Sequence, residues 1–205
     1  MSAQILSKLR AGELTGSVRL DLSCGLTEFP CEIFDLADTL EVLDLSGNQL
    51  SELPAYLARL KKLRILFCSD NDFTRLPEVL GGCPELEMVG FKANRIETLD
   101  ETAFPQKLRW LILTDNGIGA LPGSIGSCGR LQKLMLAGNR LETLPAEMAA
   151  CVNLELIRLA ANRFTQFPAW LFELPRLSWV GLGGNPWSES QGADETAMAE
   201  IDWQI

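Results

Sequence analysis

The side chains best suited to covalent or metal chemistry in this 205-residue chain are six cysteines, because it has no histidine. No two cysteines form a Cys-x-x-Cys pair, the spacing typical of zinc and redox sites. A serine nucleophile would lack a histidine base. The glycine pairs at Gly81-Gly82 and Gly183-Gly184 lack the spacing and the following lysine of a phosphate loop. We therefore predict no catalytic residue, metal site or cofactor within residues 1–205.

The elements that position these residues are set by a recurring asparagine. Its occurrences are Asn48, Asn71, Asn94, Asn116, Asn139, Asn162 and Asn185. Successive spacings are 23, 23, 22, 23, 23 and 23 residues, and apolar residues stand eight, five and three positions before each asparagine. Before Asn48 these are Leu40, Leu43 and Leu45. Such regularity indicates a repeat architecture.

Each repeat reads as one short strand followed by a turn and an outer return path. Leu43 and Leu45 alternate with polar or smaller residues, which is strand periodicity with one face buried. The asparagine amide can satisfy backbone groups in the turn, and a Leu-Pro step then begins the return. One further unit around Leu20 and Leu22, with Cys24 in place of the asparagine, makes eight units.

This pattern matches the leucine-rich repeat, in which Asn or Cys holds the turn position. It predicts an α/β repeat fold: a curved solenoid with one parallel β-sheet on its concave face. The convex side should be irregular or built of short helices. We expect a helical cap over residues 1–17, eight repeats over 18–187, and a linker or cap over 188–205.

Two departures from the pattern carry structural expectations. The fourth unit has Leu99-Asp100 where others have Leu-Pro, and its outer arc is one residue shorter, so we expect Phe104 to fill the space. Cys83, Cys128 and Cys151 replace core aliphatic residues, so we predict structural, free thiols. Free thiols are typical of a cytoplasmic protein.

The strand residues that alternate with the core should form the binding surface, since solenoids bind on their concave face. The partner-binding residues predicted there are Val42, Asp44, Ile65, Phe67, Met88, Trp110, Ile112, Met135, Leu156, Arg158 and Trp179. An exposed apolar strip of this kind marks an interaction site, and we expect a protein partner. The alternatives are that flanking residues or a terminal segment cover the strip, or that β-propensity alone selected these residues.

One column beside this strip alternates in charge. Glu41, Arg64, Glu87 and Arg109 occupy equivalent positions in consecutive units. We expect a ladder of cross-strand ion pairs that keeps the units in register rather than a binding site.

Composition narrows the partner class. The formal net charge is −9, which argues against nucleic acid, because phosphate binding needs clustered Lys and Arg. No apolar run is long enough to span a bilayer, and the first ten residues lack the features of a signal peptide. We therefore expect a cytoplasmic protein with no membrane span.

Four segments go beyond the generic repeat, and they are residues 66–71, 87–96, 108–116 and 131–139. They resemble the repeat region of bacterial leucine-rich-repeat serine/threonine protein kinases, and residues 199–205 look like a lead-in to the kinase domain. The resemblance implies a recognition module of such a kinase, with ATP and Mg²⁺ needed only if a kinase domain follows. Two alternatives stay open: a free-standing intracellular scaffold similar to the Ras-binding type, and the repeat domain of a secreted effector ubiquitin ligase. The ligand and the oligomeric state stay open as well.

Overall fold

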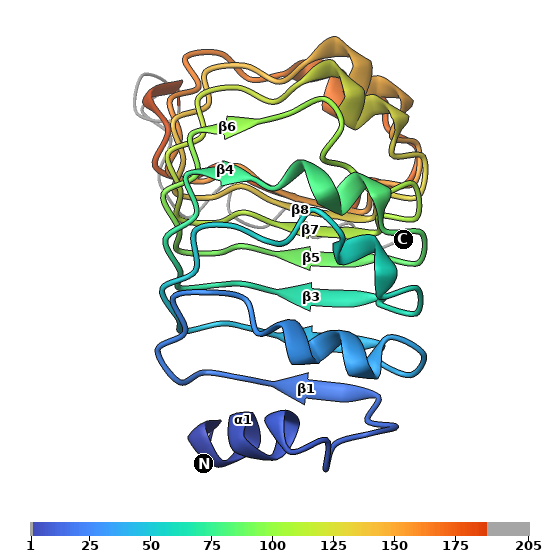
Figure 1. Cartoon of the computed structure of the whole chain (residues 1–205). Coiled ribbons are helices and arrows are strands. Elements are labelled where there is room, and N and C mark those ends of the chain that lie inside the picture. Colours follow the sequence, from blue (N-terminus) through green and yellow to red (C-terminus); the bar gives the residue numbers. More distant parts are fainter. Residues whose placement is uncertain (1, 188–205) are drawn as a thin grey trace.

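A computed structural model describes residues 2–187, which form a solenoid with one eight-stranded parallel sheet (Figure 1). Its strands, each of three residues, are β1 (Arg19–Asp21), β2 (Val42–Asp44), β3 (Ile65–Phe67), β5 (Met88–Gly90), β7 (Trp110–Ile112), β8 (Lys133–Met135), β9 (Leu156–Arg158) and β10 (Trp179–Gly181). They stand in chain order, so each unit contacts chiefly its two neighbours. The predicted solenoid fold is confirmed.

The core runs along the whole stack behind this sheet. The middle residue of each strand from β1 to β9 is buried, as Leu43 and Leu66 illustrate. The residues two positions further along, such as Leu45, are buried too. Phe73 and Phe91 meet edge to face in the core, with ring centroids 4.9 Å apart. Each unit buries its apolar residues against those of its neighbours. This shared core stabilises the stack although its strands and helices are short.

The recurring asparagines link neighbouring turns. The Asn71 amide nitrogen donates to the carbonyl oxygens of Leu45 (2.9 Å) and Cys68 (3.2 Å), and its Oδ1 accepts from the Leu50 N–H (2.9 Å). Asn48 does the same one unit earlier, where its Oδ1 accepts from the N–H groups of both Cys24 and Leu26. Each asparagine therefore completes its own turn and the preceding one, which leaves few buried backbone groups unpaired.

The outer side carries short 3-10 helices. They are η1 (Cys31–Leu36), η2 (Leu57–Arg59), η3 (Glu78–Gly82), η4 (Gly123–Ser127), η5 (Ala146–Ala150) and η6 (Ala169–Glu173). A proline precedes all of these except η2, with φ between −62° and −74°. Because proline fixes φ in that range, it sets the direction in which each outer arc begins.

The fourth unit follows a different path. Its outer arc has a strand, β6 (Thr98–Leu99), which pairs with β4 (Arg75–Leu76) of the third unit. The Asp100 carboxylate accepts hydrogen bonds from the N–H and hydroxyl of Thr102, which lowers the pKa of Asp100 and makes a tight turn in place of the Leu-Pro step.

The expectation that Phe104 fills the shortened arc is wrong in part. Ala103 takes the fully buried position, whereas Phe104 is half-buried. The arc can come this close to the third unit because Gly81 has no side chain. A Cβ at Gly81 would collide with the carbonyl oxygen of Thr102.

The N-terminal end of the stack is covered by helix α1 (Ser2–Arg10), which lies below β1 in Figure 1. Leu9 of this helix is buried in the shared core. The Arg10 guanidinium lies 3.3 Å from the Glu32 carboxylate in η1. Helix α1 thus shields the first unit. The linker or cap predicted over 188–205 lies outside the described residues.

Candidate binding surface

The sheet places the predicted binding residues in two straight columns. The first column is Arg19, Val42, Ile65, Met88, Trp110, Lys133, Leu156 and Trp179. The second is Asp21, Asp44, Phe67, Gly90, Ile112, Met135, Arg158 and Gly181. We call the surface made by these two columns the sheet face. Because the pairing is parallel and in register, repeat position alone decides which side chains are neighbours.

All eleven residues predicted to bind a partner lie on the sheet face. Arg158 is exposed, and the others, which are Val42, Asp44, Ile65, Phe67, Met88, Trp110, Ile112, Met135, Leu156 and Trp179, are partly exposed. The intervening residues, such as Leu111, are buried. The sheet face is therefore a surface with a large apolar share and not part of the core.

Two aromatic rings on this surface occupy the space beside glycines. A Cβ on Gly90 would stand 2.6 Å from Cδ1 of Phe67, its register partner in the preceding unit. A Cβ on Gly181 would stand 2.5 Å from the ring of Trp179 in the same strand. The glycines leave room for these rings, because a side chain at either position would collide with the ring.

Cations cover the two tryptophans of the C-terminal half. Lys133 Nζ lies 4.1 Å from the centroid of the Trp110 ring, and the Arg158 guanidinium lies 5.0 Å from that of Trp179. Cation–π contacts of this kind are attractive at such distances. In the described chain neither Lys133 nor Arg158 forms an ion pair, so both charges stay available to a partner.

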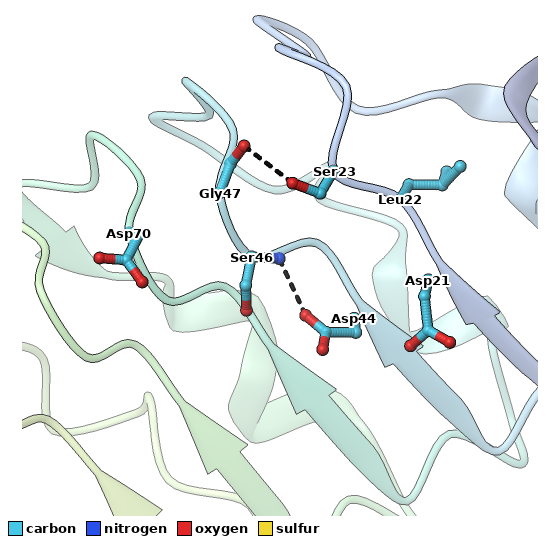
Figure 2. A pocket seen from close by; sticks show the side chains of 7 residues that line it. All are labelled: Asp21, Leu22, Ser23, Asp44, Ser46, Gly47 and Asp70. Carbon is cyan, nitrogen blue, oxygen red and sulfur yellow. Dashed lines mark hydrogen bonds between the residues drawn. The ribbon is translucent and has the colours of Figure 1, made fainter. Parts of the chain in front are cut away.

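At the other end of the sheet face, an acidic hollow of about 360 Å³ opens beside the first strands (Figure 2). Its lining is Asp21, Leu22, Ser23, Asp44, Ser46, Gly47 and Asp70. Asp44 accepts a hydrogen bond from the Ser46 N–H (2.9 Å), and Asp21 is held by Arg19 through two contacts of 2.7 and 2.8 Å. Asp70 enters from the next turn, with a φ of 52°.

Sequence reasoning missed this hollow because five of its seven lining residues lie beyond the strands. Ser46 and Asp70 occupy turn positions two and three residues after the second strand column. Aligning the repeats past the strand ends would have placed them beside Asp44. A second hollow of about 240 Å³, on the outer arcs beside Phe167 and Trp170, was missed for the same reason.

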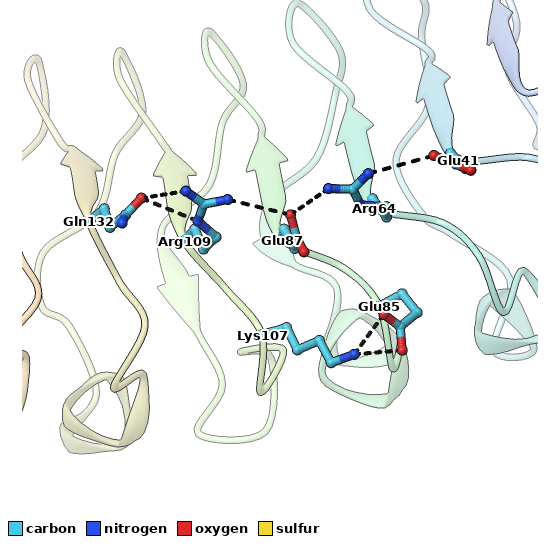
Figure 3. Close-up of polar contacts among 7 residues, drawn as sticks. All are labelled: Glu41, Arg64, Glu85, Glu87, Lys107, Arg109 and Gln132. Atoms are coloured by element: carbon cyan, nitrogen blue, oxygen red, sulfur yellow. Dashed lines mark hydrogen bonds and ion pairs between the residues drawn. The ribbon is translucent and has the colours of Figure 1, made fainter.

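The predicted charge ladder is present beside the sheet face and is one unit longer (Figure 3). Arg64 lies 3.7 Å from Glu41 and 3.1 Å from Glu87, and Arg109 lies 3.8 Å from Glu87. Arg109 also donates to Gln132 Oε1 at 2.9 and 3.2 Å. The hydrogen bond with Glu87 raises the pKa of Arg64. The charged and polar groups of this column are therefore paired with one another across five units.

Four of the six cysteines belong to the core rather than to this surface. All six are free, and Cys68, Cys83, Cys128 and Cys151 are buried. Burial raises the pKa of Cys128 to about 12 and that of Cys83 and Cys151 to about 11. Such thiols stay protonated and are poor nucleophiles near neutral pH.

Within residues 2–187 no three His, Cys, Asp or Glu side chains are grouped so as to hold a metal ion. No helix of that part of the chain combines the length and the apolar character that a bilayer crossing requires.

Comparison with known families finds leucine-rich repeats in two parts of the chain. The family described as "Leucine Rich repeats (2 copies)" matches residues 38–78, and the family described as "Leucine rich repeat" matches residues 129–186. The repeat interpretation is therefore confirmed in both halves of the stack.

The chain is also similar to short parts of much longer proteins. It is 41% identical over 69 residues to "Leucine-rich repeat-containing protein 7" of Homo sapiens, which is 33% of this chain and 4% of that protein. It is 39% identical over 66 residues to "Probable serine/threonine-protein kinase roco9" of Dictyostelium discoideum, or 32% of this chain and 2% of that protein.

Two solved structures share the fold. A leucine-rich-repeat protein of Leptospira interrogans matches 81% of this chain with a TM-score of 0.63 and 28% identity. An internalin of Listeria monocytogenes matches 84% with a TM-score of 0.68 and 21% identity. The matched region is about half of each solved chain, 48% and 49% respectively.

Proposed function

We propose that this leucine-rich-repeat solenoid is a protein-recognition module whose partner lies across the sheet face. One observation carries the proposal: the register places an aromatic and aliphatic strip on the partly exposed side of the sheet. A contiguous apolar patch that is exposed to solvent marks an interaction site more often than not.

The composition of the strip supports a protein partner. Trp110 and Trp179 are large anchors of the type that dominates binding energy at interfaces. Met88 and Met135 are flexible and adapt to varied shapes. The surface thus combines fixed rings with adaptable side chains.

Affinity capture with two double variants tests this proposal. Phe67→Asp with Trp110→Asp should abolish retention of a specific protein partner from the source cell, because both charges would be buried under it. The control is Val152→Asp with Phe172→Asp, two apolar residues that are 47% and 57% exposed outside the sheet face. It should retain the partner, and circular dichroism should be unchanged in both. Equal retention by both double variants would contradict the proposal.

A finer proposal is that the solenoid directs a protein kinase. Two observations support it: the resemblance of residues 66–71, 87–96, 108–116 and 131–139 to the repeat region of bacterial kinases, and the similarity to part of the Dictyostelium kinase. The solenoid would then select a substrate or regulator for the attached catalytic domain.

The gene itself tests the kinase proposal. A kinase domain encoded in the same reading frame as the repeats would support it. A complete reading frame with no kinase motif would contradict it and would leave sheet-face binding unaffected.

A further inference from the structure

The sheet face carries two sets of unpaired charge at opposite ends. Five charged residues occupy the two columns, and two of them, Arg19 and Asp21, bind each other. The remaining three are Asp44 in β2, Lys133 in β8 and Arg158 in β9. None of these three forms an ion pair with another described residue. The available charge is therefore negative near α1 and positive toward β10.

The turns beside the strands reinforce the negative end. Asp70 lines the same hollow as Asp44 and also lacks an ion pair among the described residues. In the middle of the stack, Lys92 lies 4.0 Å from Asp115, so those two charges offset each other. Glu155 is in the seventh unit but lies before β9, in the ladder column rather than in the sheet face.

Between the charged ends the surface is apolar. Ile65, Phe67, Met88, Trp110 and Ile112 fill the three strands that separate β2 from β8. With strands about 4.8 Å apart, Asp44 is four strand steps, or roughly 19 Å, from Lys133, and five steps, or roughly 24 Å, from Arg158. An extended segment spans this distance in about six or seven residues, and a helix in about 13 to 16.

We propose that the partner of the sheet face is a bipolar polypeptide segment that crosses the strands. Its basic side chains lie against Asp44 and Asp70, its apolar side chains lie on Phe67 and Trp110, and its carboxylates lie against Lys133 and Arg158. This proposal rests on the proposed function, because it concerns the same surface. Charge complementarity of this kind fixes the orientation in which a partner binds and disfavours partners of the wrong charge order.

A phage-displayed library of random 16-residue peptides supplies the probe. Selection on the whole protein follows depletion on the Phe67→Asp and Trp110→Asp double variant, which removes peptides that bind elsewhere. We expect the enriched peptides to have Lys or Arg at one end, Asp or Glu at the other and apolar residues between. Enriched peptides without this charge order would overturn the bipolar proposal and leave sheet-face binding intact. Absence of any enrichment over the double variant would contradict both proposals.

Affinity measurements on one enriched synthetic peptide then locate its two ends. Asp44→Lys with Asp70→Lys should weaken binding by about tenfold or more, and so should Lys133→Glu with Arg158→Glu. The control, Asp38→Lys with Glu52→Lys, makes the same change in net charge at exposed positions outside the sheet face and should leave the affinity within about twofold. Equal losses in the control and the acidic-end variant would overturn the proposal.

Neutralising the basic end of the peptide distinguishes a direct contact with Asp44 and Asp70 from long-range attraction between net charges. A peptide with Gln in place of its Lys or Arg should no longer respond to the Asp44 and Asp70 reversal, but it should still respond to the Lys133 and Arg158 reversal. If Asp44→Lys unfolds the protein, Asp44→Asn keeps an acceptor for the Ser46 N–H and removes the charge alone. Unchanged sensitivity of the neutralised peptide to the Asp44 and Asp70 reversal would overturn the proposal.

Discussion

Lys133 of one unit covers the indole of Trp110 in the preceding unit, with its ammonium nitrogen 4.1 Å from the ring centroid. The two residues are register partners in β8 and β7. A cation and an aromatic surface on the sheet face are thus joined before any partner binds.

This contact should contribute a small, measurable amount to stability. Lys133→Ala should lower the free energy of unfolding by about 0.5–1 kcal/mol, the usual size of a cation–π contact near the surface. Urea unfolding of Lys133→Ala, Trp110→Leu and the double variant gives the coupling between the residues. Additive effects of the two substitutions would show that the contact contributes nothing.

The recurring asparagines from Asn48 to Asn185, which we call the asparagine ladder, should contribute most of the local stability of the turns. Asn139→Ala removes an amide that donates to the carbonyl oxygens of Leu113 and Leu136 and accepts from the Ile118 N–H. Because these backbone groups are buried, we expect a loss of roughly 3 kcal/mol or more in urea unfolding. The matched control is Asn153→Ala, whose amide donates to the Gly129 oxygen near the surface, with a loss below about 1 kcal/mol. Similar losses in both would refute a special role for the ladder.

The shortened fourth arc should depend on Gly81. Gly81→Ala places a methyl group against the carbonyl oxygen of Thr102 and should cost about 1–3 kcal/mol in unfolding experiments. Its neighbour Gly82 is the control, since a Cβ there meets only Ala58, at 3.8 Å. Gly82→Ala should be close to neutral. A fully stable Gly81→Ala variant would mean that the arc relaxes without loss.

Stability should fall at alkaline pH because the buried thiols ionise only on unfolding. An unfolded cysteine titrates near pH 8.5, whereas burial raises the pKa of Cys83 and Cys151 to about 11 and of Cys128 to about 12. The contribution of these thiols to the free energy of unfolding is fully present below about pH 8.5, and it is lost as the pH rises through 11 to 12. Cys151→Ala should make the decline between about pH 9 and 11 shallower. An unchanged slope would contradict this assignment.

Thiol labelling in the folded protein should distinguish the cysteines. Cys31 is exposed, with its sulfur 3.6 Å from the Tyr56 hydroxyl, and should react first with iodoacetamide at pH 8. Cys68, Cys83, Cys128 and Cys151 should react only after urea is added, because burial suppresses both access and the thiolate form. Mass spectrometry of labelled peptides gives the order. Early labelling of Cys128 would show that the core opens locally.

The repeat pattern predicts the strands and their register because one asparagine position fixes the phase of every unit. Once Asn48 and Asn71 are aligned, Val42 and Ile65 must be neighbours on the sheet, and the structure pairs them. The sheet-face columns and the charge ladder follow from the same alignment.

Which side chain lies over which neighbour on the sheet face does not follow from the alignment of the repeats. The Phe67 ring lies beside Gly90 because glycine leaves room there. Lys133 lies over Trp110 because its flexible side chain can reach the aromatic ring and form a cation–π contact. Column order names the neighbours of a residue but not the rotamer that it adopts. The choice of Ala103 over Phe104 for the core likewise depends on how close two arcs can come.

The asparagine ladder also limits how the gene can change in length. Each asparagine binds groups of its own turn and of the turn before it, so a copied or deleted unit of 23 residues leaves every amide with its full set of partners. The outer arc can also lose one residue, because in the 22-residue fourth unit Asn116 still donates to the Phe91 and Leu113 oxygens and accepts from the Ile96 N–H. Copying of a whole unit therefore keeps every amide paired, but a copy of the 22-residue fourth unit also needs a glycine at the position of Gly81 in the unit before it.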